Sequence, residues 1–396
     1  MIHAKTAQAE EPLVRTTSVG DPTPAAAPTS KKSQRFFHLD ALRASLMFWG
    51  ILVHASTVEK VPVFRTIAEI SGLVRMEAFF VISGFLAYML LKKYGAVATV
   101  RKRLVAIGLP FVTALVILNP VTNWLVYNYH NAPISFAAFL SGERVDPVNG
   151  PINWHLHLWF LVALFVYSLL APFLEKMVDA GVRIVSPRSP FKSSQLRFFA
   201  MASTVVASCI AARVIFEYAF EPLLPESLDF VTRSVGNYLP FYALGMLLFA
   251  VPSLRREFSS VHWIQTVLSC CLLVVAHQLP ESVPNLVAET FILAAQTYVA
   301  FCLSSLLFWI AEKWVSSESK TARSLSESAY TVYLFHFLVL YLLAFVLHGW
   351  IGNDAVLLSV ISISTFAVTL CIQHFLIRRV PVLELLFNGK RPRRSK

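Results

Sequence analysis

Ten apolar segments, each close to the length of a membrane-crossing helix, recur along this 396-residue chain. A helix rises 1.5 Å per residue, so about 20 apolar residues cross the hydrocarbon layer of a bilayer. Only 14% of the residues are charged and the mean hydropathy is +0.61, whereas soluble domains carry about 25% charged residues. The sequence therefore predicts an all-α, polytopic integral membrane protein with about ten transmembrane helices. The segments are approximately 39–58, 70–91, 104–127, 157–175, 198–218, 232–251, 261–279, 287–312, 327–348 and 354–377.

Lys and Arg residues are distributed unevenly among the connections between these segments. With ten spans both termini lie on one side, and if that side is the cytoplasm, most of the 34 Lys and Arg residues are cytoplasmic. Short cytoplasmic loops of membrane proteins are enriched in these residues. We therefore predict cytoplasmic N- and C-termini. The net charge of +11 is interpreted as a topology signal, and no nucleic-acid partner is expected.

The chain divides into one membrane domain and two tails. Residues 1–34 lack the apolar core of a signal peptide and are rich in Ala, Pro, Thr and Ser, which predicts a disordered cytoplasmic tail. Residues 35–390 hold all ten predicted spans. Residues 391–396 form a basic cytoplasmic tail.

The first apolar segment, Leu39 to Ser56, carries ionisable residues near both ends. Such residues are costly in a membrane segment and are candidates for function. Arg43 and His54 are about three helical turns apart, so both side chains leave one face, about 16 Å apart along the axis. His54 is the candidate base because imidazole titrates near neutral pH; a histidine at the membrane interface is the alternative. Arg43 is a candidate for stabilising an anion, or for an i,i+3 pair with Asp40.

Five further polar residues are predicted at or inside the later spans. They are candidates to line a polar chamber around His54, because ionisable and hydroxyl groups in spans usually face the interior of the bundle. For the residues of the ninth span, which lie three apart on one helix face, packed core polar groups are the alternative. The five residues are Arg75, Glu77, His157, Tyr333 and His336, and Asp40 of the first segment is a sixth candidate to line the chamber.

The loop after the second span contains Arg101, Lys102 and Arg103. One interpretation is that these cations anchor the cytoplasmic face of the membrane. The other is that they hold an anionic cofactor, because the arginine fork matches phosphate geometry. Within the second span itself, Gly84 follows Ser83, and this pair of small residues predicts the close approach of another helix.

No metal site is expected. His155 and His157 stand two residues apart and therefore do not share one helix face, and no other His or Cys spacing completes a zinc site. The motifs G-x-x-x-x-G-K, G-x-S-x-G and H-E-x-x-H do not occur. Phosphate-loop, hydrolase-elbow and zinc-protease functions are therefore unsupported.

Several of these stretches together resemble the acyltransferase-3 family of membrane acyltransferases. The Arg43–His54 spacing is followed by FFVISGF at Phe79–Phe85, and SAYTVYLFH at Ser328–His336 resembles the family's late helix. Within the family, the chain is most similar to members that add succinyl groups to osmoregulated periplasmic glucans. That similarity lies in LDALRASLMFWGILVHAS, RMEAFFVISGFLAYML, HLWFL at 157–161, YLPFYALGMLLF at 238–249 and VPVLELLFNGK at 380–390.

The resemblance implies that residues 35–390 are a multi-pass acyltransferase domain of the bacterial inner membrane. It implies a cytoplasmic acyl-CoA donor, succinyl-CoA, with no permanently bound cofactor, and a periplasmic glucan as acceptor. Membrane lipid and other glucan-biosynthesis proteins are the further partners that it implies.

The resemblance also implies roles for four residues. His54 takes the essential histidine role, as general base or as acyl relay, and Arg43 takes the essential basic role. Arg101 and Arg103 would bind the acyl donor. Ala106 stands where the family often has another arginine.

Two alternative functions remain open at this point. The protein could be an O-acetyltransferase whose acceptor is O-antigen or another surface polysaccharide. It could also be a transporter or flippase, which performs no chemistry.

A succinyl donor carries a free carboxylate, which an outer cation such as Arg75 or Arg213 would receive. Arg213 also has an i,i+4 partner in Glu217, which predicts an ion pair.

Overall fold

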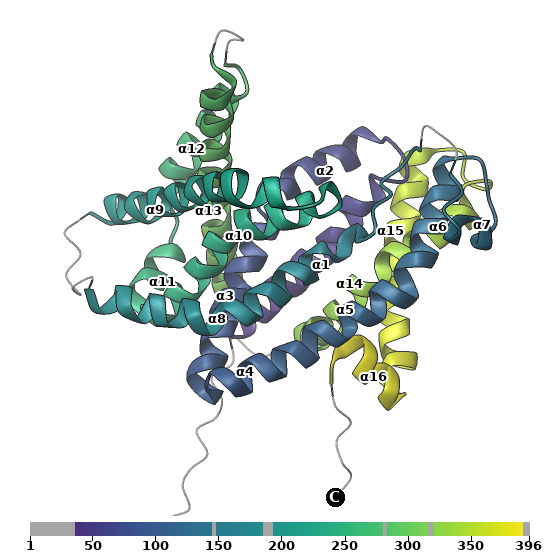
Figure 1. Ribbon diagram of the computed structural model, residues 1–396, viewed down its shortest axis with the longest axis horizontal. Helices are drawn as coiled ribbons and strands as arrows, with labels where there is room; N and C mark the ends of the chain where they lie inside the picture. The colour runs from purple at the N-terminus through teal and green to yellow at the C-terminus, as the bar shows by residue number, and fades with distance from the viewer. Residues whose placement is uncertain (1–35, 145–147, 185–192, 280–282, 316–319, 391–396) are drawn as a thin grey trace, which may run out of the picture. The chain divides into compact units, whose positions relative to one another are not determined.

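The computed structural model describes residues 36–144, 148–184, 193–279, 283–315 and 320–390. In these ranges every regular element is a helix and no strand occurs (Figure 1). The prediction of an all-α chain is confirmed. The predicted tails, 1–34 and 391–396, lie outside the described residues.

The longer helices account for most of the predicted spans, and short π-helical or 3-10 turns interrupt some of them. The first half contains α1 (Phe37–Ala55), α2 (Pro62–Gly72), α3 (Arg75–Tyr94), α4 (Ala96–Arg103), η1 (Leu104–Gly108), α5 (Leu109–Thr113), η2 (Ala114–Leu118), α6 (Asn119–His130), α7 (Phe136–Leu140), η3 (Leu156–Leu158) and α8 (Trp159–Ile184). The second half contains α9 (Ser194–Ile215), η4 (Phe216–Phe220), η5 (Glu221–Leu223), α10 (Glu226–Ala250), α11 (Pro252–Phe258), α12 (Trp263–Ala276), α13 (Asn285–Trp314), α14 (Lys320–Leu347), α15 (Asp354–Cys371), η6 (Ile372–Ile377) and α16 (Pro381–Asn388).

Seven helical segments among the described residues are long and apolar enough to cross a membrane. The number rises to eight if α10 and α11, which meet at a bend of 120°, count as one span. The helices α1 and α12 are not among the seven, because α1 contains several ionisable residues and α12 has only 14 residues. The chain is thus a multi-pass membrane protein by length and composition, and the count of ten spans stays a prediction.

The α3 helix packs so tightly against α10 that their backbones touch. A Cβ atom built on Gly84 would lie 1.9 Å from the carbonyl oxygen of Tyr242, and one built on Gly245 would lie 1.9 Å from that of Val81. No side chain fits at either position, so glycine is required on both helices. The close approach predicted from Gly84 is confirmed, and it buries the whole stretch from Phe79 to Phe85.

The α1 and α14 helices lie side by side and run in the same direction. Near their starts, Arg43 of α1 contacts Ser326 of α14, and near the end of α1 the ring of His54 contacts His336 of α14. The two helices also contact each other between these points, and α15 packs against both. The pair therefore forms a continuous wall along the line from Arg43 to His54.

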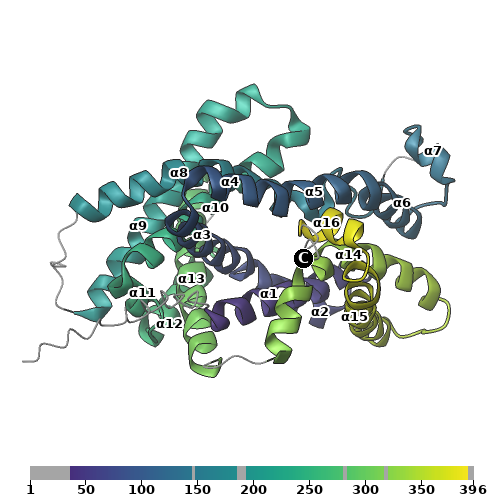
Figure 2. The same cartoon turned by 90° about the horizontal axis from the view of Figure 1, so that it is seen from below.

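The last helix, α16, packs back against earlier helices of the chain. It packs on α5 and α14, as Figure 2 shows. Its Asn388 and Gln373 of η6 are hydrogen-bonded to each other and to Thr331 of α14, and all three side chains are buried. Gly389 follows in the left-handed conformation, φ 61°, against Ala106, where an added Cβ would lie 2.4 Å from the Ala106 Cα. The C-terminal segment is thereby attached to the same helix that carries His336.

Candidate active site

Three histidine rings from distant parts of the chain meet at the end of α1. They are His54 of α1, His157 of η3 and His336 of α14. The ring centroids are 5.1 Å apart for His54 and His336, 4.8 Å for His157 and His336, and 6.1 Å for His54 and His157. The ring of Phe337 covers His54 at 4.9 Å and stacks on His157 at 5.3 Å. We call His54, His157 and His336 the histidine cluster.

A strained turn directs His157 into the cluster. Leu156 has a φ of 44°, in the left-handed region that a residue with a branched side chain rarely occupies. The hydroxyl of Tyr333 donates a hydrogen bond of 2.6 Å to the carbonyl oxygen of His157, and the two rings are 5.2 Å apart. Tyr333 thus holds the turn from α14. Backbone strain of this kind is typical of functional sites.

His336 presents a free lone pair to the cluster. Its Nδ1 lies 2.7 Å from the carbonyl oxygen of Tyr333 and 3.1 Å from that of Val332. A carbonyl oxygen only accepts hydrogen bonds, so Nδ1 carries the proton and Nε2 is the acceptor. That Nε2 atom is buried and has no partner among the described residues. His336 can therefore take up a proton at Nε2 without losing a hydrogen bond.

The three histidines differ in exposure. His157 and His336 are 6% and 3% exposed, whereas His54 keeps part of its surface accessible. His54 is therefore the least buried residue of the three. No group of three or more His, Cys, Asp and Glu side chains in the described ranges has the arrangement of a metal site. The three histidine rings contact one another in tilted and T-shaped arrangements.

Arg75, the first residue of α3, reaches across to α1. Its Nη1 would lie 2.7 Å from a Cβ built on Gly50, so the guanidinium lies directly on the backbone of α1. Gly50 is four residues before His54 and therefore lies one turn away on the same face. Gly50 was not among the residues predicted from the sequence. The signal that could have identified it is a small residue one turn from a polar residue in an apolar helix, which indicates a close contact at that position.

Unpaired polar atoms are concentrated around the histidine cluster. Most buried polar groups in proteins have a hydrogen-bond partner, so each exception needs an explanation. Several buried atoms without a partner belong to the cluster or to residues next to it on α3 and α14. They are Nε of Arg75, Oε2 of Glu77, both ring nitrogens of His157, the hydroxyl of Tyr330 and Nε2 of His336. A polar ligand would satisfy these groups.

The structure places Arg43 away from the histidine cluster, at the other end of the wall. Its Nη2 lies 3.3 Å from Oδ1 of Asp40 and 3.1 Å from the hydroxyl of Ser326. The predicted i,i+3 pair is confirmed. Arg43 remains about 16 Å along α1 from His54, so the two residues do not act on the same atoms.

Arg101 and Arg103 lie farther from the histidine cluster. The α3 helix has 20 residues and is about 30 Å long, and both arginines follow its end while Arg75 begins it. Nε of Arg103 donates a hydrogen bond of 3.0 Å to the hydroxyl of Ser168 on α8, and Arg101 is exposed. Ala106, which Gly389 contacts, lies one turn beyond Arg103. The structure thus separates a cationic region at one end of α3 from the histidine cluster at the other.

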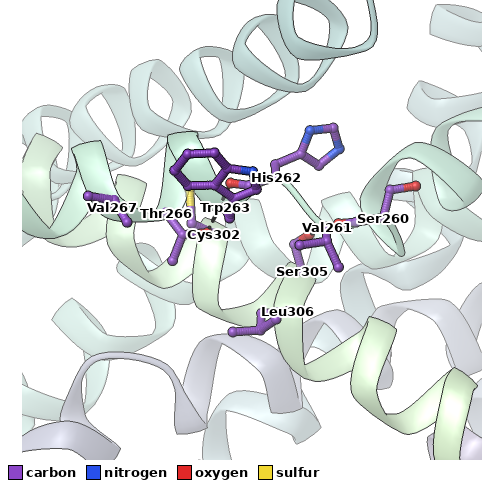
Figure 3. Close-up of a pocket in the computed structure, with 9 residues that line it drawn as sticks. All are labelled: Ser260, Val261, His262, Trp263, Thr266, Val267, Cys302, Ser305 and Leu306. Carbon is purple, nitrogen blue, oxygen red and sulfur yellow. Dashed lines mark hydrogen bonds between the residues drawn. The ribbon is translucent and has the colours of Figure 1, made fainter.

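Among the described residues, cavities also occur outside the histidine cluster, and two of them contain or approach polar side chains of interest. The first, about 140 Å³, lies between α12 and α13 around Trp263, Cys302 and Ser305 (Figure 3). Its His262 stacks on Phe198 and has Glu257 as a partner, which explains it as a packed structural histidine. The second, about 520 Å³, opens beyond the end of α1 and is lined by Ser56, Lys60, Val61, Pro62, Arg65, Ala68 and Glu69. This second cavity therefore opens at the same end of α1 as His54, but no residue of the histidine cluster lines it.

Comparison with known proteins gives one family and a set of distant relatives. The family model described as an acyltransferase domain, Acyl_transf_3, matches residues 36–374. Glucans biosynthesis protein C of Escherichia coli K12 is 26% identical, with 90% of this chain and 95% of the relative aligned. The protein of the same name from E. coli O81 is 25% identical with the same coverage. No solved structure matches the chain significantly.

Proposed function

Because the chain belongs to the acyltransferase-3 family of membrane acyltransferases, we propose that it moves an acyl group from cytoplasmic acyl-CoA to hydroxyl groups of a glucan outside the bacterial inner membrane. The acyl group in this proposal is succinyl. The printed name of the E. coli relatives concerns glucan biosynthesis, which supports a glucan as acceptor. One observation carries the proposal. His54, which is partly exposed as a residue, meets the buried rings of His157 and His336, whose ring nitrogens include atoms without a hydrogen-bond partner.

The proposed reaction needs a base where the sugar hydroxyl arrives. His54 takes the hydroxyl proton while the sugar oxygen attacks the thioester carbonyl. The carbon–sulfur bond breaks and coenzyme A leaves as a thiol after taking up that proton. The cavity lined by Ser56 opens at the same end of α1 as His54, which supports the entry of a glycan from that side. An acyl-imidazole on His54 is the alternative route to the same products.

The proposed donor route follows the wall of α1 and α14. Coenzyme A carries phosphates and stays on the cytoplasmic side, where Arg101 and Arg103 are placed by the predicted topology. Its uncharged pantetheine arm would extend past Arg43 towards His54, about 16 Å along α1. Holding thioester and hydroxyl together in this way supplies much of the rate enhancement in a two-substrate reaction.

Mass spectrometry of glucans from a deletion strain tests the proposed function. We expect the glucan backbone at its normal amount without acyl substituents, and restoration of the substituents by the gene on a plasmid. Loss of the glucan itself from the periplasm would indicate a transporter. Normal glucan substituents together with a changed surface polysaccharide would identify that polysaccharide as the acceptor.

Replacing Arg103 by glutamine should weaken the binding of acyl-CoA. A charge-assisted hydrogen bond contributes about 1.5–3 kcal/mol, so we expect the KM for acyl-CoA to rise roughly tenfold or more with little change in kcat. Steady-state kinetics of the purified protein measure this. Lys102→Gln is the matched control because Lys102 lies on the ring of Tyr94 at 3.3 Å. An equal rise of KM in both variants would contradict a specific contact at Arg103.

Replacing His336 by glutamine should lower kcat about 100-fold, in the range of general acid–base effects, and leave both KM values unchanged. His336 is a positioning residue here, because its ring contacts His54 and its Nε2 can share the proton. Full reaction progress curves separate kcat from KM. His262→Gln, which removes the packed histidine near α12, is the control. A drop in kcat of the same size in both variants would contradict the role of His336.

A further inference from the structure

Arg75 lies against the backbone of α1 without a carboxylate partner among the described residues. Arg43 pairs with Asp40, and Arg197 pairs with Glu257. No carboxylate of the described residues lies within 4 Å of Arg75, and its buried Nε has no hydrogen-bond partner. Burying a charge without a partner is costly, so the position calls for an anion that the described part of the chain does not itself supply.

The nearest carboxyl group does not neutralise Arg75. Glu77 lies two residues further along α3, and residues two apart on a helix do not face each other. Oε2 of Glu77 is itself without a partner. The other electrostatic neighbours of Arg75 are the phenols of Tyr238 and Tyr333, which are polar but carry no charge at neutral pH. Glu77 thus acts on the guanidinium only through space, and no carboxylate of the described residues forms a direct ion pair with Arg75.

The position of Arg75 relative to His54 limits how far the anionic end of a ligand can lie from a carbonyl group held at His54. The guanidinium lies on Gly50, which is four residues from His54 and therefore about 6 Å away along the helix axis. An anion held there is joined to a carbonyl at His54 by a short spacer. In a succinyl group only two methylene groups separate the free carboxylate from the acyl carbonyl, so its two ends can lie against groups that are one helical turn apart.

We propose that Arg75 binds the free carboxylate of the acyl group being transferred and so selects a dicarboxylic half-thioester over an uncharged acyl group. The arginine fork presents paired donors that fit a carboxylate. Arg213, the other candidate from the sequence, is already occupied: its Nε lies 2.6 Å from Glu217 and its Nη2 lies 2.7 Å from Glu289. This inference rests on the proposed acyl transfer.

Donor competition tests the inference. Purified protein receives succinyl-CoA or butyryl-CoA, a four-carbon uncharged analogue, with unsubstituted glucan from the deletion strain as acceptor. We expect the wild type to prefer succinyl-CoA. Arg75→Gln should lose about 100-fold in kcat/KM for succinyl-CoA, as for loss of a charge-assisted pair, and less than about threefold for butyryl-CoA. Arg213→Gln is the matched control, and it should keep the wild-type donor ratio.

Arg75→Lys keeps the test valid if Arg75→Gln does not fold. Lysine retains the positive charge and loses the paired donors of the guanidinium, so we expect kcat/KM to fall about tenfold for succinyl-CoA only. This variant should elute like the wild type in size-exclusion chromatography. Equal losses with both donors, or a wild type without preference, would overturn the assignment of Arg75 and leave acyl transfer intact. A wild type that transfers neither acyl group would overturn the proposed function itself.

Discussion

Alanine in place of His54 is expected to abolish acyl transfer, with a rate at least about 10³-fold below the wild type. His54 is the only member of the histidine cluster that is not fully buried as a residue, and its ring contacts the buried rings of His157 and His336. A glycan hydroxyl that reaches the cluster would therefore lose its proposed base. The acyl content of glucan from the complemented deletion strain and the transfer rate of purified protein both measure the effect.

The protein itself should remain folded in this variant. His54 lies in the last turn of α1, and the buried contacts of that helix come from Leu39, Leu46 and Ile51. His38→Ala, at the other end of α1, is the matched control and should keep transfer within a few-fold of the wild type. Glucan that stays fully acylated in the His54→Ala strain would rule out His54 as base and as relay.

Alanine in place of Gly84 is expected to prevent stable folding. The new Cβ would lie 1.9 Å from the carbonyl oxygen of Tyr242, and backbone atoms of a helix cannot move aside as a side chain can. The α3 and α10 helices would have to separate, which opens the core around Phe80. We expect a loss of about 3 kcal/mol or more, at the upper end for overpacked sites. Thermal unfolding of detergent-solubilised protein, read by size-exclusion chromatography, measures the loss.

Two further variants sharpen this prediction. Gly245→Ala meets the carbonyl oxygen of Val81 at 1.9 Å from the opposite helix, and it should be equally damaging. Gly181→Ala in α8, where an added Cβ finds no atom within 4 Å, should be neutral or slightly stabilising because alanine favours helix over glycine. Unfolding of Gly84→Ala at the temperature of the Gly181→Ala control would show that the helices tolerate the methyl group.

Local chemistry made several of these features predictable. The helical class follows from long apolar segments, the Asp40–Arg43 pair from i,i+3 spacing and the close helix approach from Gly84, because each depends on residues that are near in sequence. The bend between α10 and α11 is harder to see in a hydropathy profile. It occurs at Val251, directly before Pro252, and the residue before a proline is disfavoured in helical conformation.

The arrangement of the histidine cluster could not be predicted from local pattern. His54, His157 and His336 come from three distant segments, and only the packing of α1, η3 and α14 brings their rings together. The turn that aims His157 depends on Leu156 in a left-handed conformation, although leucine gives no turn signal. The sequence could not show either that Arg75 has no carboxylate within 4 Å among the described residues, because this is a property of the folded bundle.

The wall formed by the parallel helices α1 and α14 is much shorter between Arg43 and His54 than the membrane is thick. The distance from Arg43 to His54 along α1 is about 16 Å, whereas the hydrocarbon layer of a bilayer is about 30 Å thick. The two polar ends of this wall are thus separated by roughly half a membrane. Under the proposed acyl transfer, a pantetheine arm that extends past Arg43 to His54 would cover this half, so the acyl group travels far less than the width of the lipid around it.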